Sequence, residues 1–151
     1  MLSLGLLMGA PHEQIDVILK FAGKPGRDAL FDGLAASVDN TRRASRKLLH
    51  PKPFELLNHA LIADDASDGG EYIVEFLQKY YAGLKGVYFH NTHLKDDAGF
   101  AGYWSFETAA VVILRDIDDS GFRDNIYYPA ELADYARRRA RKVRSTARRP
   151  R

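Results

Sequence analysis

The chain contains no cysteine, which excludes disulfide bonds, thiol catalysis and cysteine-ligated metal sites. The opening residues 1–11 hold only about eight apolar positions and no basic segment, too few for a signal peptide or a membrane span. Period-two alternation with hairpin turns is absent, and so are a glycine-rich phosphate loop and a serine nucleophile elbow. We therefore expect a protein that binds a partner, and no enzyme, cofactor, metal site or membrane association.

Charge is divided unevenly along the chain, although the net charge is only +2. Residues 137–151 carry nine basic side chains and no acidic one, which makes +9. Residues 1–136 carry thirteen basic and all twenty acidic side chains, which makes −7. We predict two parts, an acidic helical domain over 1–138 and a basic, Arg-rich tail over 139–151.

Apolar residues recur at spacings of three and four over most of the 151 residues, which predicts one all-α domain, a compact bundle of about six antiparallel helices. Residues 39–53 are expected to form a linker with one helical turn at 45–49, and 64–70 to form a turn. The expected helices cover the end of a helix at 1–8, then 11–23, 27–38, 53–63, 71–84, 103–114, and a last helix from 130 or 131 into the arginines.

The stretch from Tyr103 to Leu114 is apolar on every side of a helical projection, so we expect it to be the central helix of the bundle. Its one charge in the middle, Glu107, then needs a partner or a place at the rim. The predicted structural core includes Tyr103, Trp104, Phe106, Glu107 and Tyr128.

Residues 87–101 lack helical periodicity, and a connection of this length is often functional. They hold His90, His93, Asp96 and Asp97, residue types that ligate divalent metals. One hypothesis is therefore a metal-dependent hydrolase that uses His90, His93 and Asp97. The spacing differs from that of zinc proteases, whose two histidines are one helical turn apart, so an ordinary polar loop is the preferred interpretation.

Acidic residues gather near both ends of the expected central helix. Such residues are usually caps and solvated turns, but they also suit a docking face for a positively charged protein. A further hypothesis is nucleic-acid binding through the Arg-rich tail; because this tail has no interleaved aromatic residues, we do not expect direct nucleic-acid binding. The candidate partner-binding residues are His93, Asp96, Asp97, Asp116, Asp118, Asp119 and Asp124.

Three short motifs occur in a fixed order: Tyr103-Trp104-Ser105-Phe106-Glu107, Ile117-Asp118-Asp119-Ser120 and Tyr127-Tyr128-Pro129. With them, about residues 2–138 resemble the C-terminal domain of PoNi-type bacterial immunity proteins. The resemblance implies an all-helical cytoplasmic protein that protects a bacterium by direct binding of a DNA-degrading toxin, delivered by type VI or related secretion. Family members usually carry a further helical region before this domain, and the Arg-rich tail is not part of their pattern.

Overall fold

The computed structural model describes the chain except residues 23, 44, 88–89, 95–99, 101 and 148–151. The described part is helical and contains no strand, which confirms the all-α prediction. Its elements are α1 (Leu2–Met8), α2 (His12–Ala22), α3 (Ala29–Ala35), α4 (Pro51–Ile62), α5 (Ala66–Gly83), the 3-10 helix η1 (Thr92–Leu94), α6 (Phe106–Arg115) and α7 (Ala130–Ala147).

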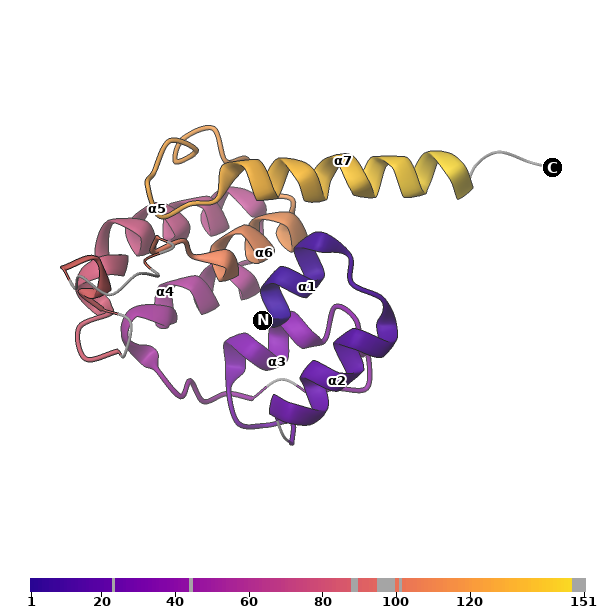
Figure 1. Cartoon of the computed structure of the whole chain (residues 1–151), viewed down its shortest axis with the longest axis horizontal. Coiled ribbons are helices and arrows are strands. Elements are labelled where there is room, and N and C mark those ends of the chain that lie inside the picture. The colour runs from indigo at the N-terminus through magenta and orange to yellow at the C-terminus, as the bar shows by residue number, and fades with distance from the viewer. Residues whose placement is uncertain (23, 44, 88–89, 95–99, 101, 148–151) are drawn as a thin grey trace.

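Helix α6 lies in the middle of the bundle, where it contacts α1, α4, α5 and α7 (Figure 1). Helices α4 and α5 pack against each other as a pair, and α1, α2 and α3 gather at the other side of α6. The core between these helices is made of fully buried aliphatic and aromatic side chains, among them Leu57, Ile73, Phe76, Val111 and Val112.

The helix begins three residues later than predicted, because Ser105 is its N-cap and accepts a hydrogen bond from the backbone N–H of Thr108. Tyr103 and Trp104 therefore precede α6 in an extended segment. The prediction that Trp104 belongs to the core is wrong, since 51% of this residue is exposed. Small and β-branched residues of α6 fill the interior instead. Tyr128 is buried, and Tyr103, Phe106 and Glu107 are half-buried.

Helix α5 begins at Ala66, so the prediction that the turn extends to residue 70 is wrong. Asp65 caps the helix by accepting a hydrogen bond from the N–H of Asp68 at 2.9 Å. Gly69 lies inside the first turns, where a Cβ atom would come within 2.9 Å of Ile117 Cδ1 and 3.3 Å of the Ala60 carbonyl oxygen. Glycine is needed here for close approach between elements, so it does not mark a helix end.

The linker after α3 contains no helical turn at residues 45–49, contrary to prediction. Two carboxylates hold it to α3 instead. Asp32 is buried and accepts hydrogen bonds from Arg42 Nε at 2.8 Å and from the N–H of Ser45 at 3.3 Å. Asp28 caps α3 and also accepts a hydrogen bond from the N–H of Leu49 at 2.8 Å. Satisfied polar contacts therefore replace secondary structure in this segment.

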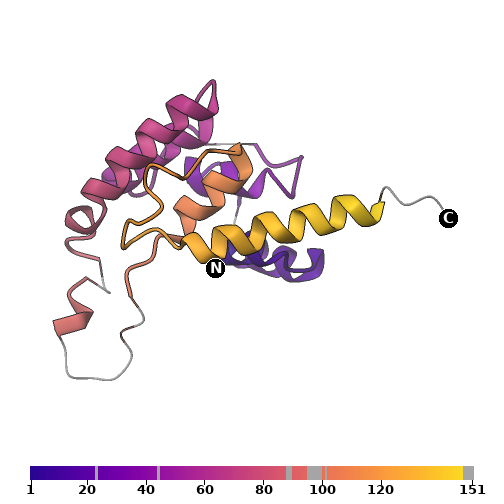
Figure 2. The same ribbon diagram turned by 90° about the horizontal axis from the view of Figure 1, so that it is seen from above.

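Helix α7 continues without a break across residues 138 and 139, and its C-terminal half projects past the rest of the molecule (Figures 1 and 2). Arg139 Nη2 donates a hydrogen bond to the Leu6 carbonyl oxygen at 3.2 Å, whereas residues 141–146 are exposed. Among the described residues, no helix has the length and apolar character that crossing a membrane would require.

Candidate functional site

Residues 116–129 connect α6 to α7 and hold four of the seven candidate partner-binding residues. Asp116 ends α6 in the left-handed conformation, with φ 51° and ψ 40°, and its side chain is exposed. The next residue, Ile117, is buried and packs close to Gly69 of α5. The chain is thereby anchored at the start of the connection, and the acidic residues that follow have a defined place on the surface.

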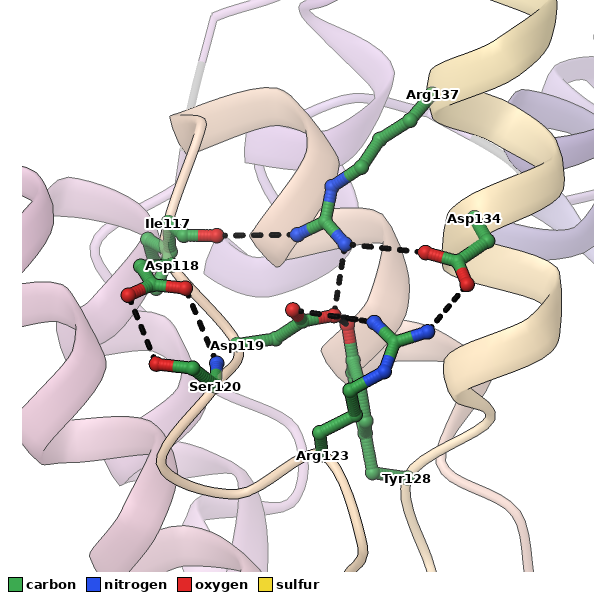
Figure 3. A network of polar contacts seen from close by, with 8 residues as sticks. All are labelled: Ile117, Asp118, Asp119, Ser120, Arg123, Tyr128, Asp134 and Arg137. Atoms are coloured by element: carbon green, nitrogen blue, oxygen red, sulfur yellow. Dashed lines mark hydrogen bonds and ion pairs between the residues drawn. The ribbon is translucent and has the colours of Figure 1, made fainter.

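Asp118 and Asp119 are neighbours in the chain, yet their environments differ. Asp118 is exposed and closes a local turn by accepting hydrogen bonds from the N–H of Ser120 at 3.1 Å and from its hydroxyl at 2.9 Å. Asp119 is only 5% exposed and points inward (Figure 3). Only Asp118 of the two therefore presents a carboxylate to a binding partner.

Asp119 lies at the centre of a polar network between the connection and α7 (Figure 3). Its Oδ2 atom accepts hydrogen bonds from Arg137 Nη1 and from the Tyr128 hydroxyl, each at 2.8 Å, and an ion pair with Arg123 Nη1 at 3.2 Å. Arg123 also binds Asp134 of α7. Two carboxylates thus meet two guanidinium groups, so the buried charges of this network are balanced.

The network shifts the acidity of its buried members. Burial by itself raises the pKa of Asp119, but the hydrogen bonds from Arg137 and Tyr128, with the charges of both arginines, outweigh it and hold this pKa below its ordinary value. Burial raises the pKa of Tyr128, and the hydrogen bond to Asp119 raises it further. Asp119 is therefore a carboxylate and Tyr128 a neutral phenol at neutral pH, which is the combination that the hydrogen bond requires.

The connection has two functional layers. An outer layer exposes the carboxylates of Asp116, Asp118 and Asp124, which we call the acidic surface. The inner layer holds the connection against α7. Sequence reasoning missed the inner layer. A signal for it existed, because Asp119 and Arg123 are four residues apart and Asp134 and Arg137 are three apart, spacings at which opposite charges can pair.

His93 lies at the other end of α6, in the exposed element η1. Its Nδ1 atom is 2.7 Å from the hydroxyl of Tyr103, and the ring of Tyr81 stacks near both His90 and Tyr103, with ring centroids 4.9 and 5.0 Å away. Phe100 completes this aromatic cluster, whose centre, Tyr81, the sequence analysis did not single out. The structure therefore surrounds His93 with aromatic rings.

Asp96 and Asp97, also predicted to bind a partner, lie outside the described residues. The hydrolase hypothesis needs Asp97, so the geometry of that trio lies outside the described part as well. Within the part of the chain that the structure describes, no three histidine, aspartate or glutamate side chains gather in a way that would hold a metal ion.

Comparison with known families identifies this arrangement. Residues 26–132 match the family model of the PoNe immunity proteins (PoNi), C-terminal. The chain belongs to this family. The matched region holds both ends of α6, including the acidic surface and the aromatic cluster, and ends before Asp134 and Arg137. The resemblance inferred from the three sequence motifs is thereby confirmed.

Among solved structures, the PoNi chain is similar to protein PA2201 from Pseudomonas aeruginosa, with 28% sequence identity and a TM-score of 0.66. The match covers 92% of this chain and 49% of that protein, so the chain spans about half of its length. No curated protein matches the chain.

Proposed function

We propose that this PoNi chain neutralises a cognate antibacterial DNase toxin in the cytoplasm of the cell that it protects. The observation that carries the proposal is the family match over residues 26–132. The toxin is expected to arrive by type VI or related secretion. The protein acts in this proposal by binding, and we expect no enzymatic activity and no cofactor.

The acidic surface is the proposed contact with the toxin. A nuclease presents positive charge to the phosphates of DNA, so exposed carboxylates attract it over a distance and compete with DNA for the same groove. Asp116, Asp118 and Asp124 suit this role because they are exposed on one connection. The aromatic cluster at the other end of α6, with His93, is a second proposed contact region, since aromatic residues are enriched in interface hot spots.

The inner layer supports binding indirectly. Because Arg137 and Arg123 hold Asp119 to α7, the connection does not have to become ordered when the toxin binds. A surface that is already held in its bound conformation loses less entropy on association. Asp119 is thus a positioning residue in this proposal, and it should not be replaced in an experiment on the contact itself.

Charge reversal of the acidic surface tests the proposal. We expect Asp116→Lys, Asp118→Lys and Asp124→Lys together to abolish protection when the variant is expressed in one cell with the toxin encoded beside it. The helical circular dichroism signal and the melting temperature should stay close to those of the parent, since all three side chains are exposed. Binding of the purified proteins should weaken, and the remaining affinity should depend less on salt.

A matched control carries the same change of charge elsewhere. Asp16, Glu55 and Glu75 are exposed acidic residues of α2, α4 and α5. Their joint replacement by Lys should leave protection intact. If both triple variants protect fully at equal expression, the acidic surface is not the contact. If the parent chain does not protect, the immunity function itself is wrong for this toxin.

A further inference from the structure

An apolar groove opens on the side of the molecule formed by α1, α2 and α3. Its volume is about 740 Å³, within the range of about 300 to 1,000 Å³ in which proteins bind ligands or partner side chains. Apolar side chains from several helices line it, among them Leu2, Val17, Phe21, Leu30, Phe31 and Phe54. The groove plays no part in the contact proposed above.

Large apolar side chains stand exposed at the edge of this groove. Phe21 is 89% exposed, Val17 is 51% exposed and Met1 is 83% exposed. Single exposed apolar residues are ordinary, but a group of them beside an apolar groove marks an interaction surface. Phe21 and the groove together form a projecting aromatic ring and a space that could receive one, side by side on the same surface.

Charged side chains run along the same outward face of α2. Glu13, Val17, Lys20 and Phe21 follow one another at spacings of three and four, so they share one side of the helix, while Ile15 on the opposite side is buried. Lys24, just after the helix, lines the groove with Val17 and Phe21. The face is thus acidic at its N-terminal end, apolar in the middle and basic at its C-terminal end.

We propose that this face binds a second copy of the chain, with the two α2 helices antiparallel across a two-fold axis. Such an axis reverses the helix direction, so Glu13 of one copy meets Lys20 and Lys24 of the other. It also brings Val17 opposite Phe21 of the second copy, whose ring enters the groove. The pattern is self-complementary, as an isologous interface requires, and this complementarity selects a second copy as the occupant.

The proposed interface leaves the acidic surface free. In Figure 1, α2 lies at the lower right and the connection between α6 and α7 lies at the upper left of the molecule. The dimer therefore carries two accessible acidic surfaces, and loss of the dimer should not by itself remove the ability of one copy to bind a toxin. This separation makes the two proposals distinguishable by experiment.

The first test is the mass of the full-length protein in solution, measured by light scattering and sedimentation over a wide range of concentration. We expect a dimer that dissociates on dilution. Phe21→Glu should raise the dissociation constant by roughly thirtyfold or more, as replacement of a hot-spot aromatic does. Ile62→Glu changes a similarly exposed apolar residue of α4 and should leave the dimer unchanged.

The second test exchanges the charges. Glu13→Lys should weaken the dimer, and so should Lys20→Glu combined with Lys24→Glu, whereas the three changes together should restore it. All three residues are exposed, so the melting temperature of the monomer should change little. A monomer at every concentration, a dimer insensitive to Phe21→Glu, or a triple variant without restored association would each overturn the proposal.

Discussion

Asp119 is 5% exposed and binds two arginines and a tyrosine hydroxyl, so its removal leaves buried donors without an acceptor. We expect Asp119→Ala to lower the free energy of unfolding by about 3 to 5 kcal/mol, as removal of one partner of a buried ion pair does. Urea unfolding followed by circular dichroism measures this loss. The neighbouring exposed residue provides the control, because Asp118→Ala should cost about 1 kcal/mol or less. Equal losses in both variants would contradict the assignment of the inner layer.

The same residue should give the protein a dependence of stability on acid. The pKa of Asp119 is lower in the folded than in the unfolded protein, so the unfolded state binds a proton more readily. Its contribution is therefore complete above the ordinary aspartate pKa of about 3.9 and is lost as the pH falls through the folded value. Urea unfolding between pH 7 and acid should show a shallower loss of stability for Asp119→Asn than for the parent. An unchanged slope would mean that other carboxylates dominate acid unfolding.

At the scale of elements, the first turn of α5 contains two adjacent glycines with different surroundings. A Cβ atom on Gly69 would meet Ile117 Cδ1 at 2.9 Å and the Ala60 carbonyl oxygen at 3.3 Å, whereas one on Gly70 would have only an ordinary contact at 3.7 Å. Gly70→Ala should therefore stabilise the protein by up to about 1 kcal/mol through helix propensity. Gly69→Ala should destabilise it by about 1 to 3 kcal/mol, because overcrowding of the buried contact outweighs that gain. Thermal unfolding of the pair decides this, and a stabilised Gly69→Ala would show that Ile117 gives way at no cost.

At the scale of the whole molecule, α7 is a packed helix in its first half and a projecting basic arm in its second (Figure 2). Truncation after Ala140 removes only side chains that face solvent in the described part, so the free energy of unfolding should change by about 1 kcal/mol or less. Protection against the toxin should persist as well, since the acidic surface is untouched.

A second truncation provides the comparison. Ending the chain after Ala136 also removes Arg137, which binds Asp119 and the Ile117 carbonyl oxygen, and Arg139, which binds the Leu6 carbonyl oxygen. This variant should lose about 3 to 5 kcal/mol, because Asp119 keeps its charge without its main partner. Similar stability of the two truncated chains would show that α7 contributes little to holding the connection in place.

Local patterns in the sequence were enough to predict the helical class and the course of most helices, because the 3.6-residue period of an amphipathic helix is written in residues that are close together in the chain. The motifs at 103–107, 117–120 and 127–129 likewise indicated the family that the match over residues 26–132 established. The acidic and basic halves of the charge distribution also follow from the sequence alone.

Tertiary structure decided which residues of each pattern are available for binding. Asp118 and Asp119 are identical side chains at adjacent positions, and only the approach of Arg137, 18 residues away, buries one and leaves the other exposed. Gly69 is part of a helix because Ile117 and Ala60 pack against it, and Trp104 is half-exposed because no element covers the segment before α6. Each of these outcomes depends on contacts between residues far apart in the chain, which no local periodicity or composition contains.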